Sequence, residues 1–195
     1  ILRPTNILLL SDEVYEHIIF DNKSHESACR YPDLANRSFI CASFGKTFHV
    51  TGWKIGYCVA PEHLMKEFRK VHQFAVFCVD HPVQRALAEH LQSENNYLHL
   101  NNFYQQKRDF FLGGLEASNF TFKPSEGTYF QLLDYSTITD EHDEDFAKRL
   151  ITDYKLASIP ISSFNTKKEN NMMLRFCFAK KRETLEEALD ILNRI

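Results

Sequence analysis

The sequence predicts an α/β protein that begins with a mostly parallel sheet and ends with a smaller α/β domain. Two short, continuously apolar runs, residues 7–10 and 39–42, read as strands covered on both faces. Each run ends in polar residues, and segments with the apolar spacing of amphipathic helices follow. In α/β sheets of this kind, ligands bind beyond the carboxyl ends of the strands. The polar residues that follow the two runs are therefore the first candidates for a functional site.

The first half of the chain predicts strands followed by two amphipathic helices. Residues 21–37 are polar and read as a surface connection, whereas residues 55–60 form another apolar stretch. Pro61 suits the first turn of a helix, and Asp80 suits the start of a second one. The apolar stripes expected to face inward are Leu64, Phe68 and Val71 in the first helix and Val83, Leu87 and Leu91 in the second.

The second half predicts a long helix over residues 97–115 and then a small domain of short strands and two helices. In this domain, Thr184 and Glu187 have the spacing of a capping box at the start of the last helix. The expected strands are 120–122, 128–133, 157–160 and 172–178, and the other expected helix is 143–154. The predicted domains are 1–95 for part of a large domain, 96–118 for a connecting helix and 119–195 for the small domain.

Length and composition are those of an ordinary globular protein. The chain has 195 residues, of which 44% are hydrophobic and 25% charged, with a formal net charge of -3 at pH 7. This balance does not suggest nucleic acid or a membrane surface as a partner. The longest apolar run, residues 74–79, is too short to span a bilayer, and no secretion signal is visible at the start. We therefore expect a cytoplasmic protein without nucleic-acid or membrane partners.

The cysteines and histidines do not suggest a metal site or a disulfide framework. The five cysteines are odd in number and show no C-x-x-C spacing, and the nine histidines are scattered without ligand spacing. Several thiols fall in apolar strand-like runs, where a free cysteine behaves as a small hydrophobic residue. We expect all five to be reduced. They are Cys29, Cys41, Cys58, Cys78 and Cys177.

Residues 43–56 carry the residues with the clearest chemical meaning. Lys46 comes shortly after an apolar strand and is flanked by glycine and hydroxyl residues. If it is buried, its ammonium form is disfavoured, and the second cation at Lys54 adds to this effect. A lysine that is uncharged part of the time is a nucleophile that forms Schiff bases with carbonyl compounds.

Two other interpretations of Lys46 were weighed. Gly45-Lys46-Thr47 matches the end of a phosphate-binding P-loop, but that motif needs a glycine where this chain has Ile40. The P-loop interpretation is therefore rejected. The other is a structural lysine whose stem lies on apolar surface while its ammonium group reaches water. The tripeptide alone favours this structural interpretation.

Asp12, Tyr15 and Arg175 are also ambiguous from their local pattern. Asp12 and Tyr15 lie on one side of a helical turn if a helix begins there, but Asp12 could equally be only a helix N-cap. Strand alternation places Arg175 and Cys177 on one face, where an arginine is most often simply solvated. Its guanidinium group nevertheless matches a carboxylate with two parallel hydrogen bonds.

These motifs resemble those of the class I/II aminotransferases, the fold-type I enzymes that use pyridoxal 5'-phosphate (PLP). They are most similar to the methionine and kynurenine/glutamine aminotransferase branch, and the motifs cover essentially the whole chain in family order. Two positions depart from the broad family, Lys54 where arginine is usual and His49 where a small residue is usual. Lysine binds phosphate as a point charge without the planar fork of arginine. The matching motifs are 11–16, 43–47, 51–58, 126–130 and 174–180.

The resemblance implies the C-terminal part of a PLP-binding large domain with a mostly parallel sheet, followed by the small α/β C-terminal domain. It implies that Lys46 forms a Schiff base with PLP and moves the substrate's Cα proton. Asp12 would pair with the pyridine nitrogen, and Tyr15 would reach the phenolic oxygen. Ser43 and Lys54 would hold the phosphate.

The implied reaction moves an amino group from an L-amino acid, of methionine, glutamine or aromatic type, to a 2-oxo acid. Arg175 would hold the substrate's α-carboxylate. Family members are homodimers of about twice this chain length, so we expect this chain alone to bind PLP poorly. Two alternatives stay open: a PLP-dependent C–S β-lyase on the same scaffold, and a truncated copy that acts as a dimerisation or regulatory module.

Overall fold

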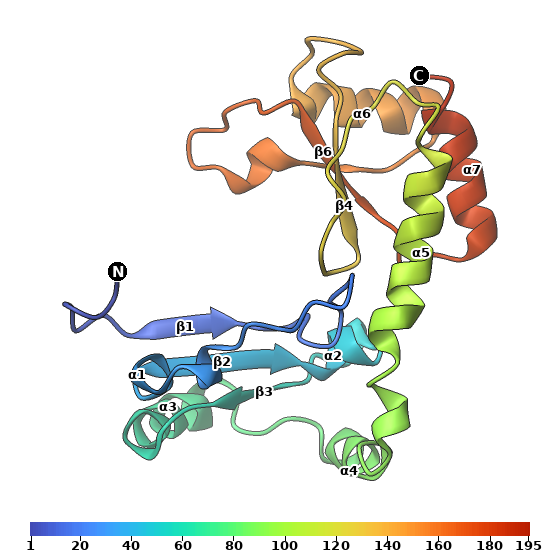
Figure 1. The fold of residues 1–195 in the computed structure, drawn as a ribbon. Helices are drawn as coiled ribbons and strands as arrows, with labels where there is room; N and C mark the ends of the chain where they lie inside the picture. The colour runs from blue at the N-terminus through green and yellow to red at the C-terminus, as the bar shows by residue number, and fades with distance from the viewer. The chain divides into compact units, whose positions relative to one another are not determined.

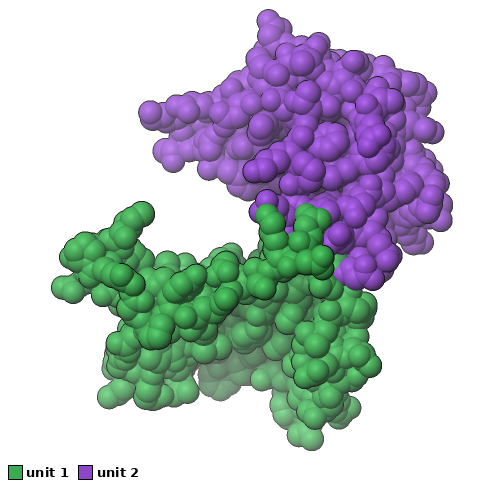
Figure 2. All heavy atoms as spheres, in the orientation of Figure 1, with its two compact units in different colours: residues 1–101 green, residues 102–195 purple.

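The computed structural model describes residues 1–195 and divides them into two compact units, residues 1–101 and 102–195 (Figure 2). Helix α5 (Leu100–Gly114) begins at the last residues of the first unit and continues in the second. None of the helices combines the length and apolar character needed to cross a membrane.

The first unit is built on a three-stranded sheet in the order β1-β2-β3 (Figure 1). Strand β1 (Leu9–Asp12) runs parallel to β2 (Ser38–Ser43), and β3 (Gly56–Val59) runs antiparallel to β2. The sheet is therefore mixed, with one pairing of each kind. Because β1 and β2 are parallel, their carboxyl ends lie at the same edge of the sheet.

Four helices accompany this sheet: α1 (Pro32–Ala35), α2 (Phe44–Thr47), α3 (Glu62–Ala75) and α4 (His81–His90). The predicted helix starts are confirmed, because α3 follows Pro61 and α4 follows Asp80. The Asp80 carboxylate accepts a hydrogen bond from the backbone N–H of Val83 at 2.9 Å, the geometry of an N-cap.

The predicted burial of the first apolar runs is wrong for part of the unit. Leu8 and Leu10 are 55% and 69% exposed, although the run 7–10 was expected to be covered on both faces. In α3, Leu64 is buried as predicted, but Val71 is 67% exposed. The physical reason is that α3 packs through its first turns, where the Phe68 ring lies 6.1 Å from that of Phe39, while its last turn is left uncovered.

Glu13, which follows β1 directly, anchors the connection between β1 and β2. Its buried carboxylate accepts hydrogen bonds from Ser11 Oγ at 2.8 Å and from the backbone N–H of Ala28 at 3.0 Å, and it lies 2.8 Å from His25 Nε2. Burial alone would raise the pKa of Glu13, but these hydrogen bonds outweigh it and lower the pKa to about 2. The predicted surface connection, residues 21–37, is therefore held next to the sheet by the buried carboxylate of Glu13.

The second unit has a three-stranded antiparallel sheet in the order β4-β6-β5, with three helices. The predicted helix 143–154 is confirmed as α6, whereas the predicted strand 120–122 is reduced to a single bridge between Thr121 and Asp134. Helices α5 and α7 run side by side (Figure 1), and Asn193 Nδ2 donates to Gly114 O at 2.9 Å. The remaining elements are β4 (Phe130–Asp134), α6 (Asp143–Tyr154), β5 (Ile159–Pro160), β6 (Met173–Cys177) and α7 (Arg182–Leu192).

The predicted capping box at Thr184 is wrong. Helix α7 begins at Arg182, and its N-cap residue, Lys181, makes no side-chain cap hydrogen bond. The backbone N–H of Leu185 donates to Lys181 O at 3.2 Å, so the first helical hydrogen bond forms upstream of the predicted cap. Leu185, Leu189 and Leu192 form the buried face of α7, and such packing stabilises a helix that has no side-chain cap.

Candidate functional site

The end of β2 turns directly into the short helix that carries Lys46. Ser43 Oγ accepts a hydrogen bond from the backbone N–H of Lys46 at 3.3 Å, and Thr47 Oγ1 donates to the carbonyl oxygen of Ser43 at 3.2 Å. Gly45 and Thr47 are buried, and Lys46 is partly buried. The lysine is therefore held by a capped turn at the carboxyl edge of the sheet.

The chain then folds back so that Lys54 lies at the same pocket as Ser43 and Lys46. Val50 N donates to Gly45 O at 3.0 Å, and Gly45 N donates to Ile55 O at 3.3 Å. Lys54 has a left-handed backbone, with φ 52° and ψ 46°, which ends the 3-10 turn Thr51–Trp53 and leads into β3. These contacts close the loop between β2 and β3.

The closed loop forms a pocket of about 260 Å³ that brings together Ser43, Lys46 and Lys54. Two lysines and a serine among the lining residues suit a small anion such as a phosphate group. Sequence patterns did not identify Thr51 as a candidate site residue. Its hydroxyl group and its position in the motif 51–58 could have indicated that it lines the pocket. The other lining residues are Ala42, Gly45, Thr51, Ile55 and Gly56.

Gly56 is required where β3 approaches β2 beside this pocket. A Cβ atom at Gly56 would lie 2.4 Å from the carbonyl oxygen of Ala42, a backbone atom that cannot move away alone. Gly56 is paired directly with Ser43 in the antiparallel register. Any larger residue at this position would push apart the two strands that carry the pocket.

Asp12 ends β1 and Tyr15 follows it at the same edge, but neither residue lines this pocket. Asp12 pairs with Cys41 across the parallel strands, and its exposed carboxylate accepts a hydrogen bond from Val14 N at 3.3 Å. No helix follows, because residues 14–17 form a turn, so the helix N-cap interpretation of Asp12 is wrong. Tyr15 is partly buried in that turn. Asp12 and Ser43 thus end neighbouring parallel strands.

Arg175 lies in the second unit, on β6, and it is not simply solvated. Its guanidinium carbon lies 4.1 Å from the ring centroid of Phe130 and 4.9 Å from that of Phe164, and its Nε is buried without a hydrogen-bond partner. Aromatic rings next to a guanidinium group stabilise the cation and restrict its orientation. Sequence patterns missed these two neighbours, although Phe130 lies within the motif 126–130. The buried unpaired donor suits an incoming carboxylate.

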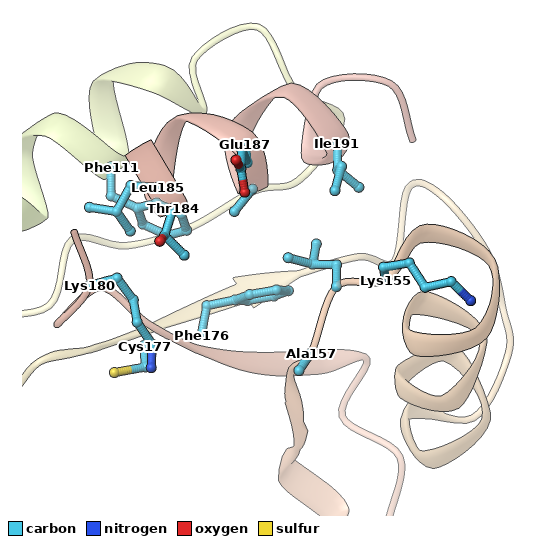
Figure 3. A pocket seen from close by; sticks show the side chains of 12 residues that line it. Phe111, Lys155, Ala157, Phe176, Cys177, Lys180, Thr184, Leu185, Glu187 and Ile191 are labelled. Carbon is cyan, nitrogen blue, oxygen red and sulfur yellow. The ribbon is translucent and has the colours of Figure 1, made fainter. Parts of the chain in front are cut away.

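A second pocket, of about 250 Å³, lies within the second unit (Figure 3). Phe176 of β6 lies on one side of it, and Leu185 and Ile191 of α7 lie on the other. The lining is largely apolar, and none of the predicted site residues belongs to it. The cation-lined pocket of the first unit is therefore the better candidate for chemistry.

Comparisons with known proteins identify the family of the chain. The family model "Aminotransferase class I and II" matches residues 1–192. The chain is 45% identical over 190 residues to methionine aminotransferase from Escherichia coli (strain K12), which covers 97% of this chain and 49% of the relative. It is 31% identical over 206 residues to human kynurenine–oxoglutarate transaminase 3, covering 95% of this chain and 45% of the relative.

Solved structures give the same result. The crystal structure of YbdL from Escherichia coli, described as having a methionine aminotransferase function, matches with a TM-score of 0.95 and 44% identity. That match covers 100% of this chain and 52% of the other chain. N-succinyldiaminopimelate aminotransferase from Mycobacterium tuberculosis matches with a TM-score of 0.91 and 31% identity, over 97% and 50% of the two chains. The chain spans about half the length of the relatives it matches.

Proposed function

Because the chain belongs to the class I and II aminotransferase family, we propose that it forms part of a PLP-dependent enzyme that transfers an amino group from an L-amino acid to a 2-oxo acid. The observation that carries this proposal is the pocket in which Ser43, Lys46 and Lys54 converge at the carboxyl edge of the sheet. Its charge and hydroxyl content suit the phosphate and carbonyl groups of the cofactor.

The residues of the first unit would hold the cofactor by its polar groups. Ser43 and Lys54 would bind the phosphate, and Lys46 would bond to the carbonyl carbon. Asp12 would pair with the ring nitrogen, and Tyr15 would donate to the phenolic oxygen. When bound, PLP supplies an electron sink for the negative charge that develops at the substrate's Cα.

The chain's own residues then bind the substrate and move a proton. Lys46 would take the proton from the substrate's Cα as a general base and deliver it to the former aldehyde carbon of the cofactor as a general acid. Asp12 would accept a hydrogen bond from the ring nitrogen. Arg175 binds the substrate's α-carboxylate, and the rings of Phe130 and Phe164 keep its guanidinium plane fixed.

The substrate class and the assembly are part of the same proposal. Methionine and aromatic-type amino acids are supported as donors by the names of the relatives, which are methionine and kynurenine aminotransferases. We place the PLP-binding large domain in residues 1–95, the connecting helix in 96–118 and the small domain in 119–195. We also propose a cytoplasmic homodimer. The homodimer is supported by the family resemblance, and the cytoplasmic location is supported by the five cysteines, all of which are free.

A transamination assay tests the function. The protein is incubated with PLP, methionine, glutamine or an aromatic amino acid, and a 2-oxo acid acceptor, with Lys46→Ala as the inactive control. An oxo acid with the carbon skeleton of the donor supports the proposal. A parallel reaction with an S-substituted cysteine tests the alternative, because cleavage of its Cβ–S bond to pyruvate, ammonia and a thiol would identify a C–S β-lyase instead.

The alternative function is that of a dimerisation or regulatory module without catalytic activity. In that case the protein would show no turnover above the Lys46→Ala control with any donor. It would still form a dimer, measurable by light scattering.

A further inference from the structure

Two cysteines face each other across the strands that bound the cation-lined pocket. Cys41 of β2 and Cys58 of β3 are direct partners in the antiparallel register. Directly opposed residues of antiparallel strands point to the same face of the sheet, with Cα atoms about 4.5–5.5 Å apart. This separation lies within the range that a disulfide spans. Both thiols are free and partly exposed.

The Cys58 thiol stays protonated beside Cys41. Burial raises the pKa of Cys58 to about 11, together with the neighbouring Cys41 side chain. The two opposed cysteines therefore do not both ionise at neutral pH, and repulsion between two thiolates does not separate them.

The other three cysteines lack such a partner. Cys177 is paired with Phe130 on β4, and Cys29 and Cys78 are exposed outside any strand. Asp12 occupies the next position in the same row as Cys41, but no group of three or more His, Cys, Asp or Glu side chains in the chain is arranged to hold a metal ion. The opposed thiols therefore favour oxidation chemistry over metal binding.

We propose that Cys41 and Cys58 form a redox-active pair that a peroxide converts into an intrachain disulfide. The thiolate of Cys41 attacks one oxygen of the peroxide, the O–O bond breaks, and the released hydroxide combines with the proton that Cys41 lost. The sulfur of Cys58 then attacks the sulfenic acid of Cys41, and the S–O bond breaks. The leaving hydroxide takes the proton of Cys58. Two thiols and one hydrogen peroxide thus give one disulfide and two waters.

The disulfide closes the segment that carries the pocket. Residues 42–57 lie between the two cysteines and include Ser43, Lys46 and Lys54. A covalent bond between β2 and β3 at the base of this segment opposes its local opening. Oxidation therefore makes the pocket loop more rigid, and reduction restores its mobility.

Peptide mapping tests the pair. The purified protein is treated with hydrogen peroxide, its remaining thiols are alkylated, and it is digested with trypsin without reduction. Mass spectrometry should find peptide 38–46 linked to peptide 55–66, with the other three cysteines alkylated. Treatment with dithiothreitol should restore all five thiols. A product with Cys41 or Cys58 oxidised singly, or with either linked to another cysteine, would overturn the proposal.

Cysteine variants and the rate of trypsin cleavage of the folded protein provide two further tests. Cys41→Ser and Cys58→Ser should each abolish the link, whereas Cys78→Ser should leave it unchanged. In the folded protein, oxidation should slow trypsin cleavage after Lys46 and Lys54 at least about threefold, reversibly. Formation of the disulfide without any change in these cleavage rates would overturn the assignment of a role in restraining the loop.

Discussion

The hydroxyl of Ser43 accepts a hydrogen bond from the backbone N–H of Lys46 at 3.3 Å, so the residue that ends β2 also begins the helix that carries the lysine. One side chain thus links the sheet, the lysine and the pocket. Ser43 also lines that pocket with Lys54. Its substitution is therefore expected to affect both local stability and anion binding.

Ser43→Ala removes the helix cap and one donor to the phosphate. We expect a loss of about 1 kcal/mol in the free energy of unfolding, because a backbone N–H loses its partner. We also expect the Kd for PLP to rise roughly tenfold, since hydrogen bonds to charged groups contribute about 1.5–3 kcal/mol. Ser43→Thr keeps the hydroxyl and serves as the control. An unchanged Kd in Ser43→Ala, measured by absorbance titration, would contradict the placement of the phosphate.

Gly56→Ala should destabilise the first unit because its Cβ would lie 2.4 Å from the Ala42 carbonyl oxygen. Overpacking of this kind costs about 1–3 kcal/mol. Gly52→Ala is the matched control, since a Cβ there meets no atom within 4 Å. Urea unfolding followed by the fluorescence of Trp53, the only tryptophan, measures both variants. Equal unfolding midpoints would show that the two strands are not in close contact at this point.

Arg175→Lys keeps the positive charge but removes the two parallel N–H donors and the planar guanidinium group that contacts the rings of Phe130 and Phe164. We expect the KM for the amino acid substrate to rise about 10- to 100-fold, because at least one strong hydrogen bond to the carboxylate is lost. An amine substrate without a carboxylate provides the control and should be unaffected. If both substrates lost activity equally, the arginine would have a structural role and would not bind the carboxylate.

The aromatic neighbours of Arg175 give a graded test of the same contact. Phe164→Leu removes the ring that lies 4.9 Å from the guanidinium carbon while keeping an apolar side chain. A cation–π contact contributes about 0.5–2 kcal/mol, so we expect the KM to rise roughly threefold. A rise as large as that of Arg175→Lys would show that Phe164 contacts the substrate itself.

Glu13 should make the stability of the first unit fall in acid. Its pKa is about 2 in the folded chain, below its ordinary value of 4.5. Its contribution to stability is therefore fully present above pH 4.5, falls progressively below that, and is lost as the pH passes through about 2. The shift corresponds to at most about 3 kcal/mol. Glu13→Gln should be less stable at neutral pH and show a flatter profile between these values, whereas the exposed Glu116→Gln should follow the unmodified protein.

How far the sequence predicted the structure depended on how local each signal was. Helix α6 and the cap at Asp80 were predicted because their apolar spacing and capping residue lie within a few residues of each other. The lysine loop was predicted from its motif, but its pocket depends on the return of Lys54 through backbone contacts between Gly45 and Ile55. The spacing of apolar residues along the sequence contains no information about such a backbone contact.

The wrong predictions concern features that depend on contacts between distant parts of the chain. The run at Leu8 and Leu10 is apolar, but apolarity does not reveal whether another element covers it. Thr184 has the spacing of a capping box, yet the helix begins earlier, at Arg182, without a side-chain cap. The stacking of Phe130 and Phe164 on Arg175 joins three segments that are distant in sequence, so no local pattern could predict it.

The most direct measurement of the central claim is to find which lysine bonds to PLP. The protein is mixed with PLP, reduced with borohydride to trap the carbon–nitrogen bond, and digested for mass spectrometry. Trapping needs only transient occupancy, so weak binding by this chain does not prevent it. We predict that the label lies on Lys46, and that Lys46→Arg abolishes it while Lys54→Arg retains it. A label on Lys54 instead, or one spread evenly over surface lysines, would contradict the assignment of Lys46 as the cofactor-binding lysine.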